Sequence, residues 1–145
     1  MPNFYFHERE FEYTLGYDGR FLFDNFDICG MGLTSLAGLP ENFAVGGYFD
    51  CSSNNLTDLY GLPEGFTVGG NFNCSYNKLK SLIGLPVLGF LVGGNFYCHE
   101  NYLTDLCGLS ENFKLGGSFY CTGNNLQDVG GLPKHILQGR SIRRG

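Results

Sequence analysis

The sequence predicts a β-rich solenoid, because one segment recurs along most of the chain and each copy holds a strand-like stretch. Copies begin at Leu33, Leu56, Leu79 and Leu103, and a shorter fragment begins at Leu126, so successive copies lie 23 or 24 residues apart. The 23 glycines among 145 residues are typical of a chain with many tight turns. We therefore expect a coil with a short parallel sheet of about five strands and little helix.

The expected strand of each coil surrounds a phenylalanine and a cysteine. In one copy Phe49 and Cys51 alternate with Asp50 and Ser52, which is the period of a half-buried strand. The phenylalanine and the cysteine should therefore point inward. The cysteines expected to form a buried ladder are Cys51, Cys74, Cys98 and Cys121, with Ile28 in the same slot of a partial first copy.

The return path of each coil, G-L-P-E-N-F and its copies, is too short for a helix of typical length. We expect extended or single-turn 3₁₀ structure there, with its leucine and phenylalanine in the core. A Gly-Gly pair, such as Gly46-Gly47, then precedes each strand. It is better explained as a repeated turn than as a phosphate cradle, because a cradle needs a following helix N-terminus. The inward residues expected in the return paths are Leu39, Phe43, Leu62, Phe66, Leu85, Phe90, Leu109 and Phe113.

The repeated string F-x-C-x-x-N-x-L resembles the leucine-rich-repeat signature L-x-L-x-x-N-x-L. The finer motif, L-T-S-L-x-G-L-P followed by V-G-G-x-F-x-C, is similar to repeats in uncharacterised bacterial and bacteriophage proteins. The resemblance covers about residues 25–133 and departs from the family at Gly46 and its equivalents, which replace the first leucine. It implies a right-handed coil and an inward asparagine whose amide bonds the backbone where the chain turns. These asparagines are Asn54, Asn77, Asn101 and Asn124.

We expect a single domain over residues 1–145. Residues 1–24, which are rich in aromatic side chains and do not fit the repeat, should form an N-terminal cap with a β-hairpin turning at Tyr17-Asp18-Gly19. Residues 25–133 form the repeat stack, and residues 134–145 a C-terminal cap with a basic tail.

Charge and hydropathy exclude some classes of partner. The formal net charge is −5, and only Arg140, Arg143 and Arg144 form a basic group, so nucleic-acid binding is disfavoured except through this tail. No secretory signal is evident, and no apolar run is long enough to span a membrane. We expect a soluble cytoplasmic protein that does not bind membranes.

The residue pattern offers no catalytic or metal site. The ladder cysteines occur once per coil, whereas zinc sites use short paired spacings, so no metal and no cofactor are expected. Cys98 and His99 are strand neighbours that point to opposite faces, so they cannot act as nucleophile and base. We expect a protein that is not an enzyme. Cys29 and Cys107 lie off the ladder, and their reactivity stays open.

If phenylalanine and cysteine point inward, the alternate residues form an outer sheet face that differs from coil to coil. Ser52 and Ser75 are also expected on this face. Large rigid aromatic side chains are enriched at protein interfaces, so Tyr97 and Tyr120 are the expected anchors. The candidate partner-binding residues are Tyr48, Asp50, Asn73, Tyr76, Asn95, Tyr97, His99, Glu100, Tyr120 and Thr122.

These observations favour a protein-binding module over an enzyme. The resemblance to bacteriophage repeats implies one specific form, an inhibitor of a bacterial host defence protein. Two alternatives stay open, namely a structural or self-assembling repeat protein of unknown oligomeric state, and nucleic-acid binding through the arginine-rich tail.

Overall fold

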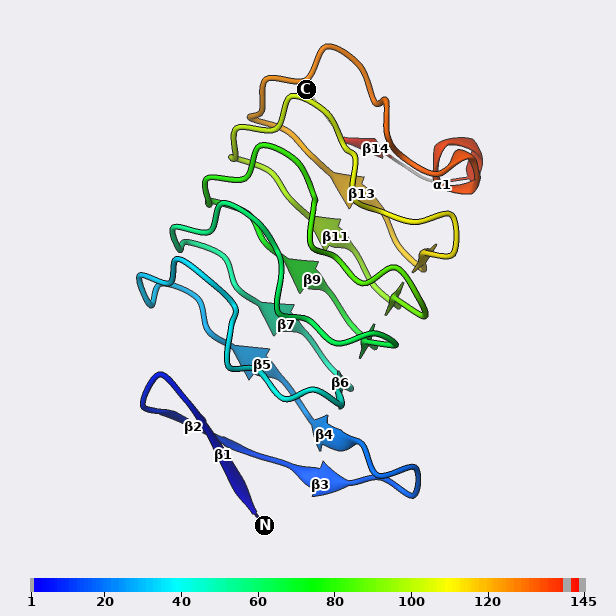
Figure 1. Ribbon diagram of the computed structural model, residues 1–145. Coiled ribbons are helices and arrows are strands. Elements are labelled where there is room, and N and C mark those ends of the chain that lie inside the picture. The colour runs from blue at the N-terminus through cyan, green and yellow to red at the C-terminus, as the bar shows by residue number, and fades with distance from the viewer. Residues whose placement is uncertain (1, 140–141, 144–145) are drawn as a thin grey trace.

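The computed structural model describes residues 2–139 and 142–143 and confirms the solenoid. About five coils stack from the N-terminal end to the C-terminal end, and almost all regular structure is β-strand (Figure 1). In the described residues no helix has the length and hydropathy needed to cross a bilayer.

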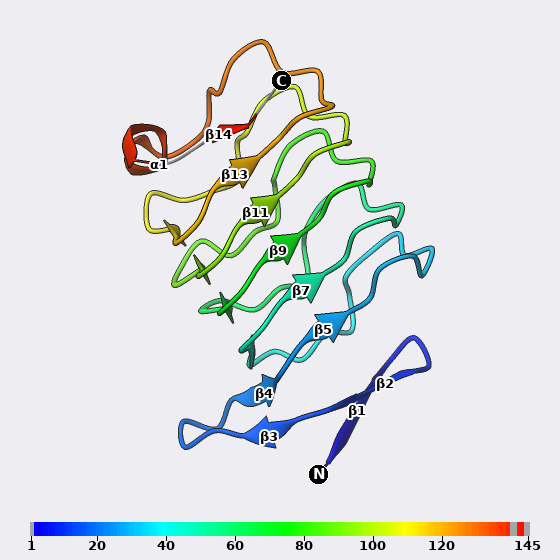
Figure 2. The same ribbon diagram turned by 180° about the vertical axis from the view of Figure 1, so that it is seen from behind.

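The predicted strands stack in parallel into one sheet, which we call the tyrosine sheet and which Figure 2 shows from its other side. Its strands pair in register, phenylalanine beside phenylalanine from coil to coil. A sixth strand from the chain's C-terminal end joins the sheet beside β13. In spatial order the strands are β5 (Phe26–Asp27), β7 (Phe49–Asp50), β9 (Phe72–Asn73), β11 (Phe96–Tyr97), β13 (Phe119–Tyr120) and β14 (Ile142–Arg143).

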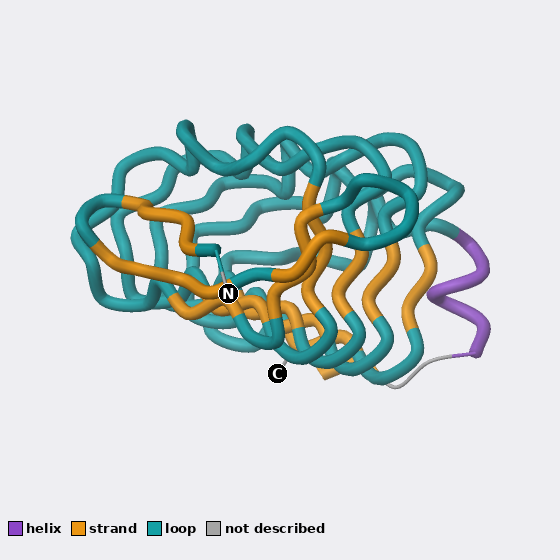
Figure 3. Tube along the Cα trace, turned by 90° about the horizontal axis from the view of Figure 1, so that it is seen from below, coloured by secondary structure: helices purple, strands orange, loops and turns teal. Residues whose placement is uncertain are grey.

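A second six-stranded sheet, the valine sheet, is formed by the end of each return path, where the sequence predicted only extended or 3₁₀ structure. The one-sheet expectation was therefore incomplete. Strands of two or three residues show no periodicity of their own, and they form because equivalent backbones meet when the coils stack (Figure 3). In spatial order the strands are β3 (Thr14–Leu15), β4 (Phe21–Phe23), β6 (Phe43–Val45), β8 (Thr67–Val68), β10 (Leu91–Val92) and β12 (Lys114–Leu115).

The Gly-Gly pair makes the bend between the two sheets. A Cβ atom on Gly69 would collide with the carbonyl oxygen of Gly46 in the preceding coil, and one on Gly93 would collide with that of Gly69. Glycine is therefore required at this bend because neighbouring backbones approach too closely for any side chain.

The core consists of two phenylalanine columns with leucines between them. The rings of the tyrosine-sheet phenylalanines stack nearly parallel from Phe26 to Phe119, with centroids 4.9–5.8 Å apart. The return-path phenylalanines meet them at steep or tilted angles, as Phe66 meets Phe49 at 80°. All eight return-path residues predicted to point inward are buried. The cysteine ladder is likewise buried, as predicted.

The inward asparagines join each coil to the one before it. Asn77 donates from Nδ2 to the carbonyls of Cys51 (3.0 Å), Cys74 (3.2 Å) and Ser75 (3.2 Å), and its Oδ1 accepts from the Leu56 amide (2.9 Å). Two of these partners belong to the preceding coil and two to its own. Asn54, Asn101 and Asn124 repeat the arrangement, so the predicted structural role is confirmed.

Two hairpins close the N-terminal end. The predicted turn at residues 17–19 joins β3 to β4, and a hairpin that the sequence analysis missed joins β1 (Asn3–Phe6) to β2 (Arg9–Glu12) through His7 and Glu8, both at positive φ. Phe11 stacks on Phe26 with ring centroids 4.0 Å apart. The cap thus covers the open end of the phenylalanine column.

The C-terminal end is closed by helix α1 (Lys134–Gly139) and by strand β14. Ile136 of the helix is fully buried, and the His135 ring lies 2.6 Å from the Phe113 carbonyl oxygen. Of the predicted basic tail, Arg143 lies in register with Tyr120. Arg140 and Arg144 lie outside the described residues.

The third copy contains one extra residue, and the coil absorbs it in the return path. Val87 and Leu88 are exposed there, and their amides donate hydrogen bonds to the Glu64 carboxylate of the preceding coil, at 3.3 and 2.6 Å. Both sheets keep their register across this coil, since Val68 still pairs with Val92 and Phe72 with Phe96.

Replacing Asn77 by alanine should lower the free energy of unfolding by about 3 kcal/mol, because buried backbone groups lose their partners. Asn55→Ala is the matched control. Asn55 directly follows the inward Asn54 of the preceding coil and is exposed, so its replacement should lower the free energy of unfolding by less than about 0.5 kcal/mol. Urea unfolding followed by circular dichroism measures both. Equal stability of the two variants would contradict the role assigned to the inward asparagines.

The thiols should differ sharply in reactivity. Burial raises the pKa of Cys51, Cys74 and Cys98 well above the ordinary value, whereas Cys107 is exposed and a hydrogen bond to Asp105 raises its pKa. A bulky disulfide reagent should modify Cys107 in the folded protein and the ladder only after unfolding. Asp105→Asn should lower the Cys107 pKa and accelerate its reaction at neutral pH. Rapid labelling of the ladder in the native state would reverse the inside–outside assignment.

Candidate functional site: the outer face of the tyrosine sheet

The outer face of the tyrosine sheet changes character along the stack. Because the strands pair in register, the residue after each phenylalanine lies directly beside its equivalent in the next coil. The column begins with two aspartates and ends with two tyrosines and an arginine. Its members are Asp27, Asp50, Asn73, Tyr97, Tyr120 and Arg143.

Four predicted residues form an aromatic group, the tyrosine cluster, consisting of Tyr76, Tyr97, His99 and Tyr120. Tyr97 and Tyr120 stack with ring centroids 4.8 Å apart and planes 22° apart. His99 meets Tyr97 edge-on at 5.8 Å and Tyr76 edge-on at 5.4 Å. The side chain of Asn95 donates to the Tyr97 hydroxyl at 3.0 Å, so the stacked pair is held in one orientation.

At the acidic end of the column the polar side chains form hydrogen bonds to the turns that follow their own strands. Asp50 accepts hydrogen bonds from the Ser52 amide and hydroxyl, and Asn73 accepts the same pair from Ser75. Ser52 and Ser75 are therefore buried, and the prediction that they face outward was wrong. The signal was present, because a short acceptor two residues before a serine is typical of an Asx-turn.

One group of potential metal ligands occurs in the part of the chain that the structure describes. Ligand atoms of Asp27, Cys29 and Asp50 lie within 4.8 Å of one another. Asp27 already accepts from the Cys29 amide and lies 4.0 Å from Arg9. A hydrogen bond to Asp27 raises the pKa of the Cys29 thiol.

A shallow hollow of about 190 Å³ lies between the acidic and aromatic ends of the face. Four predicted residues surround it, namely Tyr48, Asp50, Asn73 and Tyr97, together with Asn71. Asn71 was predicted to lie on the outer face but was not among the candidate partner-binding residues, and its side chain accepts from the Asn95 amide at 2.8 Å. The face is thus polar and aromatic, with a depression between its acidic and aromatic ends.

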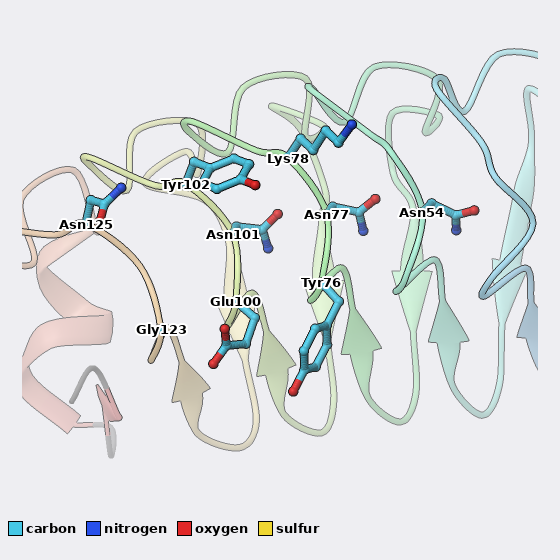
Figure 4. Close-up of a pocket in the computed structure, with 9 residues that line it drawn as sticks. All are labelled: Asn54, Tyr76, Asn77, Lys78, Glu100, Asn101, Tyr102, Gly123 and Asn125. Atoms are coloured by element: carbon cyan, nitrogen blue, oxygen red, sulfur yellow. The ribbon is translucent and has the colours of Figure 1, made fainter.

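The remaining predicted residues lie at the edge of this face, where the chain leaves each strand. Glu100 is exposed, and its amide donates to the Thr122 carbonyl at 2.9 Å. Tyr76 and Glu100 also line a separate polar groove at the corner of the coils (Figure 4). Sequence reasoning missed the far wall of that groove, which consists of Lys78, Tyr102 and Asn125.

Apolar side chains are also exposed on the return path, away from the predicted face. Tyr60, Ile83, Val87 and Leu88 are each about half exposed, and the exposed Cys107 lies in the coil next to Ile83. The sequence analysis did not identify this group, because it considered only the strand segments as a recognition surface and these residues lie on the return path.

His99 should titrate below its ordinary pKa of 6.5, because partial burial lowers its pKa and outweighs the opposing effect of the Glu100 carboxylate. Glu100→Gln should lower the His99 pKa further, since it removes the group that raises it. The histidine ring protons followed by NMR between pH 4 and 9 report both values. A midpoint above 6.5, or a rise in the E100Q variant, would contradict this electrostatic picture.

Comparisons with protein-family models, curated proteins and solved structures returned no match. The stacked parallel coil is observed directly, whereas the similarity of its repeat to leucine-rich repeats and to bacteriophage proteins stays a prediction from the motif.

Proposed function

We propose that the chain is a non-enzymatic protein-binding module whose docking surface is the outer face of the tyrosine sheet. The observation that supports this most directly is the tyrosine cluster. Tyr97 and Tyr120 present rigid aromatic area, are fixed by stacking and by Asn95, and have few internal rotations to lose on binding.

The charge distribution favours a partner with a basic side facing the N-terminal coils. Residues 1–60 contain nine acidic and two basic side chains, whereas residues 61–145 contain five and seven. Asp27 and Asp50 lie at the acidic end of the outer column. Complementary charge would steer association and fix the orientation of the partner, while the aromatic end supplies affinity.

The first partners to test are bacterial proteins, because the repeat resembles those of bacterial and bacteriophage proteins. An inhibitor of a host defence protein is one form that such a module takes. The polarity of the face, acidic then aromatic, suits a defined protein surface better than the uniform negative charge of a nucleic acid.

Affinity capture from bacterial lysate should retain a stoichiometric protein on the wild-type chain. The double variant Tyr97→Ala and Tyr120→Ala should weaken that complex by about 30-fold or more, the loss expected when the two anchors together contribute at least about 2 kcal/mol. Tyr60→Ala, which truncates an exposed tyrosine on the return path, should leave the affinity unchanged.

Each result bears on a different part of the proposal. Capture of no stoichiometric protein would refute the proposed function. Equal affinity of the double variant and the wild type would move the docking surface away from the tyrosine cluster, and loss of affinity in Tyr60→Ala would place it on the return path. Circular dichroism confirms that each variant is folded.

A further inference from the structure

A polar groove of about 450 Å³ crosses the corner where the coils leave the tyrosine sheet. Its floor is the row of inward asparagines Asn54, Asn77 and Asn101 (Figure 4). Residues on either side of each asparagine form two walls. Tyr76, Glu100 and Gly123 form the wall on the strand side, and Lys78, Tyr102 and Asn125 form the opposite wall.

The groove is rigid because its floor is fully engaged. Each asparagine in the row makes hydrogen bonds to two coils, as Asn101 does to the Cys74 and Cys98 carbonyls. Tyr76 and Glu100 have φ values of 54° and 55°, in the left-handed region that side chains rarely adopt. The flanking side chains are therefore presented from a fixed backbone, which reduces the entropy lost when a ligand binds.

Gly123 opens the strand-side wall at its C-terminal end. The equivalent residues of the preceding coils are Ser53, Tyr76 and Glu100, all at positive φ, but here no side chain is present. A Cβ atom on Gly123 would collide with the Glu100 carboxylate. The carboxylate of Glu100 therefore occupies the space next to Gly123 that a side chain at position 123 would fill. The acceptor oxygens of Glu100 are thus placed along the groove.

The side chains of the groove limit the class of ligand. None of the nine lining residues is aliphatic, so no apolar pocket exists among them for the anchor of a peptide. One lysine and one glutamate cancel in charge, so no cationic track exists for a phosphate backbone. Two tyrosines on opposite walls are more than half exposed, which offers aromatic faces beside hydrogen-bonding groups.

We propose that this groove binds a neutral oligosaccharide. A sugar ring has a CH face that packs on an aromatic ring and hydroxyl groups around its edge. Tyr76 and Tyr102 supply the faces, the Glu100 carboxylate accepts from hydroxyls, and Lys78 and Asn125 donate to them. This site shares Tyr76 and Glu100 with the proposed docking surface, whereas Lys78, Tyr102 and Asn125 belong to the groove alone.

The test is a printed array of neutral and acidic oligosaccharides, followed by titration calorimetry with the best-bound neutral compound. Tyr102→Ala should weaken binding about tenfold, the loss expected for one aromatic contact of roughly 1.4 kcal/mol. Tyr102→Phe should retain most of the affinity, because the ring face and not the hydroxyl makes the contact. Glu100→Gln should weaken binding, since a neutral amide is a weaker acceptor than a carboxylate.

Two control variants separate this site from the docking face. Tyr97→Ala and Tyr60→Ala should bind the oligosaccharide as the wild type does. Binding to no neutral oligosaccharide on the array would refute the proposal, whatever the outcome of protein capture. So would unchanged affinity in Tyr102→Ala, or a loss in Tyr97→Ala without a loss in Tyr102→Ala, because the ligand would then lie elsewhere.

Discussion

The hydrogen bonds of one inward asparagine per coil are the interaction on which the rest of the structure depends. The chain must turn sharply at the end of each strand. Backbone carbonyls at that turn are buried and lack strand partners, so they would be unpaired without another donor. The carboxamide satisfies carbonyls of two coils at once, as Asn77 does for Cys51 and Cys74. The contact joins each coil to the preceding one at the corner, directly beside the side chains that flank the asparagine.

The sequence was sufficient for the framework because each framework residue recurs with a single physical role. Phe49, Cys51 and Asn54 could be assigned to the interior from alternation and from the resemblance of the motif, and all are buried. The valine sheet could not be predicted, because Thr67-Val68 is too short to show a period and its pairing arises only when coils meet. The β1–β2 hairpin was missed since His7 and Glu8, not glycine, form its left-handed turn.

The sequence predicted the residues of the candidate face correctly only where the side chains follow strand alternation and point into solvent. Tyr97 and Tyr120 follow from strand alternation, and their stacking follows from register. Ser52 was assigned wrongly because its hydroxyl turns back to Asp50, a local bond that competes with exposure. The groove was not predicted, because residues two apart in sequence, such as Tyr76 and Lys78, form its opposite walls. Strand alternation would place such residues on the same face, but the turn after the strand separates them.

The extra residue of the third coil has a consequence for how such a chain changes over time. Lengthening the return path at Val87 and Leu88 leaves both sheets in register and leaves the asparagine row unbroken. Insertions at this side of the coil therefore alter the surface without disturbing either the tyrosine cluster or the corner groove. The return loops form a variable margin, where new sequence can accumulate while the remaining surfaces keep their geometry.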